Sequence, residues 1–209
     1  MGPVLFVPRP MFLWTSFFLL AEGLLYLLYV KWGKFRHRDR MLALHSWTGA
    51  EQVLDVGCGR GLLLAGAAKK IRDLKGSGHA FGIDIWSSVD MGANSEAATL
   101  RNLEIEGVRQ LCSLESVAAQ EMSFADESFD VIVSNLCLHN IYDRPTRELA
   151  LRNLVRVLKP GGVALISDYK KTGEYAKAFE GMGLAVSKER GGFFSTFPPL
   201  TIVVARKPL

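Results

Sequence analysis

Cysteine is scarce in this chain of 209 residues, and its placement excludes two kinds of site. The three cysteines, Cys58, Cys112 and Cys137, are far apart, and no two form a CxxC pair. Structural zinc sites and disulfide frameworks need closely spaced or paired cysteines, so we expect neither a metal site nor a disulfide scaffold. Such sparse cysteine usage is typical of a reducing compartment. Internal repeats and low-complexity runs are also missing, which excludes collagen-like and repetitive architectures.

The globular part of the chain lacks a net basic charge. The formal net charge is +4, from 25 basic and 21 acidic residues. Residues 1–42 hold six basic and two acidic residues, so residues 43–209 carry 19 of each sign. Nucleic-acid-binding domains place their basic excess on a folded surface, whereas here it belongs to one short N-terminal segment. The charge distribution therefore disfavours nucleic acid as a partner. An apolar content of 49% excludes a disordered chain.

One long apolar run lies near the N-terminus. Residues 11–30 contain a single charge, Glu22, and a helix of that length spans roughly 30 Å, the thickness of a bilayer core. Aromatic residues lie towards its ends, and the basic stretch KWGKFRHRDR follows it. A signal peptide has its basic residues before the apolar run instead. By the positive-inside rule we expect a single-pass membrane anchor, with the C-terminal side in the cytosol.

Glu22 and Gly23 keep an alternative open, in which this helix is buried against the domain, because a central acid is costly in lipid. We expect residues 1–33 to form the anchor segment and residues 34–209 the soluble domain. A helix over 34–48 should lead into that domain, with His37 solvated in its basic run.

The rest of the chain alternates between strand and helix patterns. The expected strands are 52–56, 79–85, 109–116, 130–136, 162–169, 184–190 and 200–207. The expected helices are 62–74, 93–105, 144–158 and 174–183. Such alternation predicts an α/β fold with a mostly parallel sheet and helices on both faces. The last two strands have no helix between them, so we expect an antiparallel β-hairpin.

A glycine-rich loop is the strongest local motif. The stretch VLDVGCGRG (53–61) places glycines at alternate positions between a strand and a helix, where backbone can approach a ligand closely with φ above zero. Asp84 ends the next strand, where an acid can accept hydrogen bonds from ribose hydroxyls. The dinucleotide fingerprint GxGxxG is absent, because residue 62 is Leu. Asp55 could attract a cationic cofactor or only hold the loop.

Four stretches in this order, VLDVGCGRG, FGIDI, SFDVIVSNLCLHN and LVRVLKPGGVALISD, resemble class I S-adenosylmethionine-dependent methyltransferases. The resemblance covers roughly residues 50–207. It implies a Rossmann-like three-layer α/β/α fold, with a seven-stranded sheet that ends in an antiparallel hairpin. It also implies S-adenosyl-L-methionine as the cofactor and a small molecule as the methyl acceptor.

The resemblance assigns roles to particular residues. The first motif, which cradles the methionine end of the cofactor, matches Asp55, Gly57, Cys58, Gly59 and Gly61. In the later motifs, Asp84 matches the ribose-binding acid, Ile85 would line the adenine face, and Asn135 and Leu136 would face the methyl group and substrate. Many members carry an adenine-binding acid after the third strand, but here that position is Ala118-Ala119.

Methyl transfer from a sulfonium needs alignment more than a catalytic triad, and no triad is evident. His139, just after the fourth strand, is the candidate base, with packing on a turn as the alternative role. The stretch Ser134 to Cys137 is not the Asn/Asp-Pro-Pro-Tyr/Phe form of enzymes that methylate planar amines. The aromatic loop 193–199 could line a substrate entrance, rest on the membrane or pack the hairpin.

Two functional hypotheses follow. The first is a membrane-anchored methyltransferase for a small acceptor, lipophilic acceptors included, at the cytosolic face. The second is a binding or scaffold protein that keeps the fold without turnover, which the missing acid near Ala118 favours. A nicotinamide dehydrogenase is excluded by the glycine pattern and the expected terminal hairpin.

Overall fold

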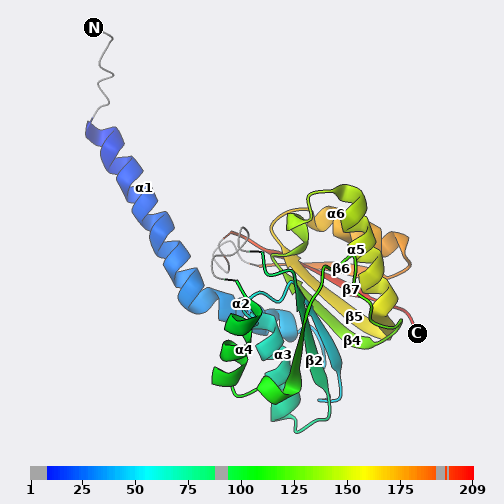
Figure 1. Ribbon diagram of the computed structural model, residues 1–209. Helices are drawn as coiled ribbons and strands as arrows, with labels where there is room; N and C mark the ends of the chain where they lie inside the picture. Colours follow the sequence, from blue (N-terminus) through cyan, green and yellow to red (C-terminus); the bar gives the residue numbers. More distant parts are fainter. Residues whose placement is uncertain (1–8, 88–93, 192–195, 197) are drawn as a thin grey trace.

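The computed structural model of the protein describes residues 9–87, 94–191, 196 and 198–209 (Figure 1). Its strands are β1 (Gln52–Val56), β2 (His79–Asp84), β3 (Cys112–Ser116), β4 (Phe129–Asn135), β5 (Leu158–Asp168), β6 (Ala185–Arg190) and β7 (Thr201–Arg206). Its α-helices are α1 (Arg9–Leu28), α2 (Lys34–Leu42), α3 (Leu62–Asp73), α4 (Glu96–Ile105), α5 (Arg144–Val157) and α6 (Thr172–Gly181). A π-helical turn, η1 (Tyr29–Gly33), and two 3₁₀ turns, η2 (Arg109–Leu111) and η3 (Leu138–Asn140), complete the described elements. The aromatic residues of the loop that the sequence analysis singled out, Phe193, Phe194 and Phe197, lie outside the described residues.

The strands form one sheet in the order β3-β2-β1-β4-β5-β7-β6. The pairs from β3 to β5 are all parallel, whereas β7 is antiparallel to both β5 and β6. This arrangement confirms the Rossmann-like fold and the terminal antiparallel hairpin. The chain order reverses between β1 and β4, and open α/β sheets bind ligands at the carboxyl ends of strands at such a point.

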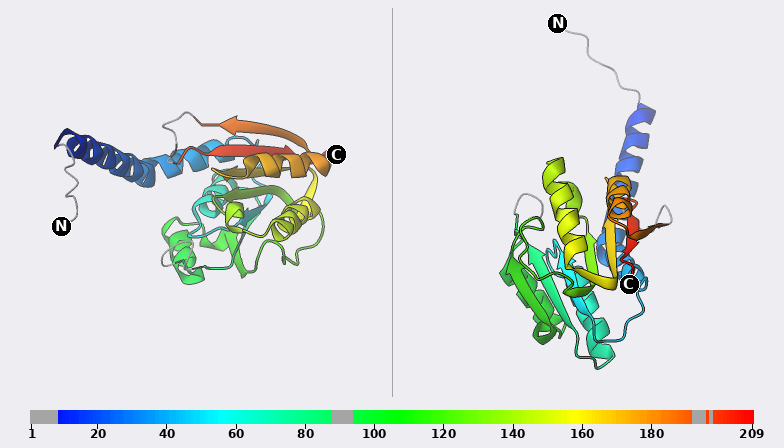
Figure 2. Two further views of the ribbon diagram at one scale, coloured as in Figure 1. Left: turned by 90° about the horizontal axis from the view of Figure 1, so that it is seen from above. Right: turned by 90° about the vertical axis from the view of Figure 1, so that its right-hand side faces the viewer.

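Alternating side chains along each strand build two cores, one on each face of the sheet. On one face Val53 packs with residues of α2 and α3, and on the other Leu54 packs with residues of α5 and α6. Figure 2 shows these helices as separate layers on opposite sides of the strands. The near-continuous apolar sequence of the central strands follows from this double burial.

Two expected elements are shorter than the sequence pattern predicts. In the segment 109–116 the first three residues form the turn η2, and only Cys112–Ser116 pair with β2. The helix expected over 34–48 ends at Leu42, whose carbonyl accepts a hydrogen bond of 2.7 Å from the indole Nε1–H of Trp47. This contact adds a short hydrogen bond to the Leu42 carbonyl, which otherwise accepts only a 3.4 Å bond from His45 N–H.

The N-terminal helix projects away from the domain (Figure 1). Of residues 12–28 none is buried, and Leu13 and Leu20 are 73% and 75% exposed. The alternative in which this helix packs against the domain is therefore not what the structure shows. Within the described residues, one helix is long and apolar enough to cross a membrane, judged by length and composition alone.

Helical backbone continues from α1 through η1 into α2 without a break, and α2 packs on the domain. Met41 and Leu42 are fully buried in the core that includes α3. Gly66 of α3 permits this approach, since a Cβ there would lie 2.6 Å from Arg38 Cδ and 2.8 Å from Leu42 Cδ1. The basic helix is thus a structural layer of the domain as well as a connector.

Candidate active site

The glycine loop after β1 has the backbone that its composition predicts. Gly57, Gly59 and Gly61 have φ of +70°, +50° and +81°, a region that residues with a Cβ rarely adopt. At Gly57 a Cβ would lie 2.1 Å from Cys137 Sγ, so glycine is also required by close packing against the segment after β4. The loop therefore presents bare backbone at the carboxyl ends of β1 and β4.

Asp55 lies at the end of β1 and is only 1% exposed. Its Oδ2 accepts a hydrogen bond of 2.8 Å from the backbone N–H of Leu64, in the first turn of α3. Burial raises the pKa of its carboxyl to about 8, and the Leu64 N–H partly offsets this effect. Asp55 thus holds the glycine loop against the start of α3. It also lines the cavity described next.

A cavity of about 500 Å³ opens at the carboxyl ends of the parallel strands, within the range of small-molecule sites. The predicted site residues that line it are Asp55, Gly57, Cys58, Gly59, Asp84, Ile85, Asn135 and Leu136. Gly61 does not line it; it lies at the start of α3, against Thr99 of α4. His139 does not line it either, although Asn140 and Ile141 next to it do.

Asp84 is held rigidly at the end of β2. Its Oδ2 accepts a 2.8 Å hydrogen bond from Gly59 N–H, and its Oδ1 accepts one of 2.7 Å from Trp86 N–H. The acid thus links the glycine loop to the segment after β2, and its carboxylate faces the cavity at that end. Such a fixed acceptor fits the two hydroxyl groups of a ribose.

Asn135 and Leu136 lie at the end of β4, on the other side of the glycine loop. The Oδ1 atom of Asn135 is buried and, within the described part of the chain, lies near the His37 ring without a well-formed hydrogen bond. Leu136 has a left-handed φ of +56°, which costs an L-residue roughly 1–2 kcal/mol. Strained backbone of this kind concentrates at functional sites. An orphaned acceptor beside the cavity indicates a ligand with an N–H donor there.

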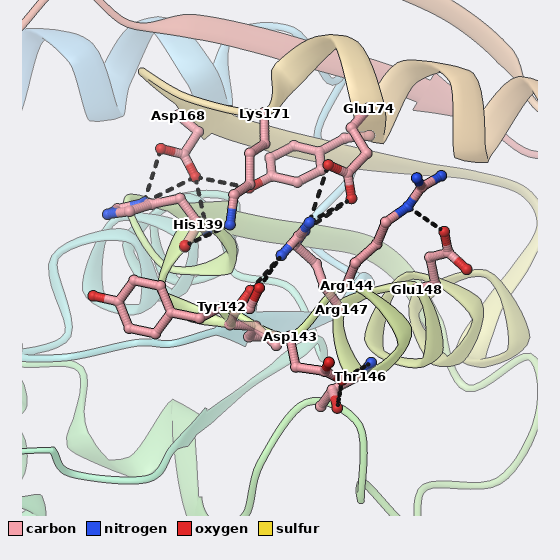
Figure 3. Close-up of polar contacts among 12 residues, drawn as sticks. His139, Tyr142, Asp143, Arg144, Thr146, Arg147, Glu148, Asp168, Lys171 and Glu174 are labelled. Atoms are coloured by element: carbon pink, nitrogen blue, oxygen red, sulfur yellow. Dashed lines mark hydrogen bonds and ion pairs between the residues drawn. The ribbon is translucent and has the colours of Figure 1, made fainter.

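His139 belongs to a compact polar cluster beside the cavity (Figure 3). Its Nδ1 lies 2.9 Å from Oδ1 of Asp168, a buried acid at the end of β5. Asp168 also accepts hydrogen bonds from the Tyr175 hydroxyl at 3.2 Å and from Tyr169 N–H at 2.8 Å. The carboxylate orients the imidazole so that Nδ1–H donates and Nε2 is left as the acceptor. Among the described residues, no group of three His, Cys, Asp or Glu is placed to hold a metal.

Arg147 supports the segment that carries His139. Its guanidinium pairs with Glu174 of α6 at 2.8 Å and donates to the carbonyl of Ile141 (Figure 3). The Arg147 side chain is only 4% exposed. A bidentate guanidinium in this position fixes the turn after η3 against both α5 and α6.

Several residues that line the cavity, or help to build its wall, carry no sequence signal for that role. Gln120 lines the cavity with Val117 and Ala118, where the adenine-binding acid is missing, and its amide supplies a polar group there. Lys34 of α2 also lines the cavity. His37, which we expected to be solvated, is 6% exposed and lies 2.7 Å from Ser167 Oγ. That expectation was wrong because the basic stretch docks one face of its helix on the sheet.

The residues present fit S-adenosylmethionine. The positive-φ loop admits close approach of a ligand, Asp84 offers a fixed carboxylate that could accept from ribose hydroxyls, and the unpartnered Oδ1 of Asn135 can accept a hydrogen bond from an ammonium group. These features lie at successive strands β2, β1 and β4, so one extended ligand can meet all of them.

Comparison with known proteins also indicates a methyltransferase. Residues 54–166, more than half of the chain, match the family described as methyltransferase domain. A ubiquinone/menaquinone biosynthesis C-methyltransferase UbiE of Vibrio campbellii is 36% identical over 121 residues, which are 58% of this chain and 42% of that protein. An uncharacterized protein of Haemophilus influenzae is 27% identical over 150 residues, 71% of this chain and 55% of that one. The chain thus spans about half the length of these curated relatives.

Solved structures show the same fold. The S-adenosylmethionine-dependent methyltransferase of Aquifex aeolicus superimposes with a TM-score of 0.62 at 18% identity, over 81% of this chain and 88% of that one. The N-methyltransferase NodS of Bradyrhizobium japonicum, solved with S-adenosylhomocysteine, gives 0.63 at 18% identity, over 83% and 87%. With the family match, the fold and the cavity together, this chain belongs to the methyltransferase-domain family of class I S-adenosylmethionine-dependent methyltransferases.

Proposed function

We propose that this protein transfers a methyl group from S-adenosylmethionine to a small lipophilic acceptor at the cytosolic face of a membrane. Residues 1–33 form the anchor segment in this proposal, and residues 34–209 form the enzyme. The observation that carries it is the continuous helix from exposed, apolar α1 into α2, because Lys34 in the first turn of α2 lines the cavity. An acceptor dissolved in the bilayer would therefore meet the site close to where the chain leaves the lipid.

When bound, the cofactor supplies a methyl group activated by its positive sulfur. The residues of this chain position the reactants around it. Asp84 and the glycine loop hold the nucleoside and methionine parts, and Asn135 and Leu136 lie at the methyl end. The apolar walls of the cavity exclude water, which favours displacement by the acceptor over hydrolysis.

His139 is the proposed base for an acceptor that starts protonated. Its Nδ1–H donates to Asp168, so Nε2 can take the proton from an acceptor hydroxyl or thiol, and the buried carboxylate stabilises the imidazolium that forms. Asp168 is a positioning residue in this scheme. His139 lies beside the cavity rather than in its wall, so the acceptor must extend past Asn140 to reach it.

Aromatic hydroxyl compounds with an isoprenoid tail are the first acceptors to examine. The relatives named for ubiquinone and menaquinone biosynthesis support this choice, as does the exposed apolar helix that continues into α2, where Lys34 lines the cavity. The matching region is less than half of the Vibrio protein, so the acceptor panel also contains other classes of lipophilic compound.

The test uses the full chain in phosphatidylcholine nanodiscs with cofactor labelled in its methyl group. Prenylated and unprenylated hydroquinones are compared, with lipophilic phenols, thiols and amines alongside. We expect transfer to a lipophilic acceptor, with kcat/KM at least about tenfold higher than for its tail-less analogue. Equal rates for both analogues would contradict the membrane-borne acceptor.

Variants at His139 test the base. His139→Gln should lower kcat by about 10²–10⁴-fold for a hydroxyl acceptor. Asp168→Asn should lower kcat to a smaller extent. Lys170→Met is the matched control, because Lys170 is exposed and contacts the Tyr169 ring rather than His139. Unchanged kcat in His139→Gln would exclude the proposed role.

A cofactor-binding protein without turnover is the second candidate. The absence of an acid at Ala118-Ala119 favours it. Tight S-adenosylhomocysteine binding by the full chain, without transfer to any acceptor of the panel, would support this function instead.

A further inference from the structure

None of the residues assigned so far provides a positive charge to bind the carboxylate of the cofactor. S-adenosylmethionine carries a carboxylate at its methionine end, whereas Asp55, Asp84 and Asn135 supply no positive charge to pair with it. A carboxylate taken from water into a partly closed cavity needs a cation or several N–H donors as partners. The described residues that line the cavity include two cations, Lys34 and Arg60.

Arg60 lies at the nucleoside end. The carbonyl of Arg60 accepts a hydrogen bond from Asn102 of α4, and Gly59 next to it is bound to Asp84 and to Thr99 of α4. These contacts place Arg60 on the side of β2 and α4, beside the ribose acid. With the ribose at Asp84, the methionine end of a bound ligand would extend the other way, towards β4.

Lys34 lies at that other end. One turn further along α2, His37 contacts Ser167 at the end of β5, and Arg38 contacts Gly66 of α3. Residues three and four apart share a helix face, so Lys34 is on the face of α2 that docks on the domain. In the sheet order β2-β1-β4-β5, α2 is therefore fixed on the far side of the loop from Asp84.

The helix that carries Lys34 is held firmly on the domain. His37, Met41 and Leu42 are buried, and burial lowers the pKa of His37 to about 4, with the nearby Arg40 charge adding to this effect, so its ring is neutral at pH 7. The lysine stem thus projects from an ordered helix rather than from a free tail. Its Nζ lies 5.0 Å from the ring centroid of Phe35, which is 36% exposed and offers only a weak competing contact.

We propose that Lys34 binds the carboxylate of the cofactor's methionine moiety, so that the membrane-proximal helix α2 completes the cofactor site. This inference requires only the cofactor, and it does not depend on the acceptor or on turnover. It makes the segment just after the apolar helix a part of the binding machinery.

The experiment compares two ligands on the full chain in phosphatidylcholine nanodiscs by calorimetry. S-adenosylhomocysteine has the carboxylate, and 5′-methylthioadenosine has the same nucleoside and sulfur but no amino-acid moiety. We expect Lys34→Met to lower affinity for S-adenosylhomocysteine about tenfold or more and to change affinity for methylthioadenosine less than about twofold. Lys34→Arg should restore most of the loss, and Lys31→Met, an exposed lysine outside the cavity, is the matched control.

Three outcomes would overturn the proposal. Equal weakening of both ligands would mean that Lys34 acts through packing of α2. Unchanged affinity for both would mean that it does not contact the cofactor. Unchanged cofactor affinity with a raised KM for the acceptor would assign Lys34 to acceptor binding instead. Because wild-type S-adenosylhomocysteine binding is measured without any acceptor, failure of the proposed reaction would not be mistaken for failure of this inference.

Discussion

At the scale of single residues, Asp84 combines two roles that are separable by measurement. Its carboxylate organises the loop through Gly59 and Trp86, and the same group faces the cavity where a ribose would lie. A neutral amide keeps the shape and one acceptor oxygen, but it loses the charge that makes hydrogen bonds to hydroxyl groups strong.

We therefore expect Asp84→Asn to weaken S-adenosylhomocysteine binding by about 10–100-fold, from loss of charge-assisted hydrogen bonds worth roughly 1.5–3 kcal/mol each. Calorimetry measures the affinity, and the thermal midpoint reports whether the loop has kept its fold. Asp73→Asn is the control, because that carboxylate is 64% exposed and pairs with Arg72. An affinity within twofold of wild type would exclude Asp84 as the ribose ligand.

His37 should make the stability of the folded protein depend on pH. Burial, with the Arg40 charge as a smaller cause, lowers the pKa of His37 from 6.5 to about 4 in the folded protein. Between these two values the unfolded chain binds the proton and the folded chain does not, so stability falls as the pH falls.

We expect acidification from pH 7 to pH 5 to lower the free energy of unfolding by about 2 kcal/mol through this residue. Urea unfolding of the chain in detergent micelles at the two pH values measures it. His37→Gln, which keeps a polar side chain near Ser167, should lack this component. The same pH dependence in wild type and variant would show that His37 is not the group that titrates.

At the scale of elements, helices α5 and α6 hold the segment that follows β4. Arg147 joins Glu174 to the carbonyls of Ile141 and Tyr142, and Asp143 caps α5 by accepting from Thr146 N–H. Ile141 lines the cavity, so this wall depends on helix packing rather than on the sheet alone.

Arg147→Lys should therefore destabilise the fold by about 1–3 kcal/mol, because lysine cannot reproduce the bidentate contact and leaves partly buried acceptors unpaired. Chemical denaturation measures the loss. Arg144→Lys is the matched control on the same helix, and its exposed pair with Glu148 should contribute less than about 1 kcal/mol. Equal effects of the two substitutions would argue against a special role for the Arg147 contacts.

At the scale of the whole molecule, one continuous helix has two different environments. Its α1 part is exposed on all sides, and its α2 part supplies buried side chains to the domain core. The boundary that we propose at residue 33 thus falls inside a helix, next to the π-helical turn. Such turns mark local irregularities where a helix can change its course.

Two deletions separate these parts. Removal of residues 1–30 should abolish partition into liposomes while leaving S-adenosylhomocysteine affinity within about twofold, because α2 remains docked. Removal of residues 1–42 should also destabilise the domain by several kcal/mol, since burial of Met41 and Leu42 contributes roughly 1.5–3 kcal/mol each. Flotation, calorimetry and urea unfolding measure these effects. Liposome binding by the shorter deletion would contradict the anchor.

Much of this molecule could be predicted from local sequence. The glycines of VLDVGCGRG have the positive φ values expected of them, because only glycine adopts that backbone at little cost. The alternation of strands and helices determined the parallel sheet, and the missing helix between the last two strands determined the hairpin. In both cases the signal lies within a few neighbouring residues, or in the order of elements along the chain.

Only the tertiary structure shows which residues far apart in the sequence contact each other at the site. His37 meets Ser167 across 130 positions of sequence, and His139 meets Asp168 across 29. His37 was expected to be solvated but is buried, and Lys34 of the same helix lines the cavity, because the apolar face of α2 finds its partner only in the folded domain. Charge and periodicity show which residues a helix can present, whereas the sheet and the neighbouring helices determine which face is buried and which lysine lines the cavity.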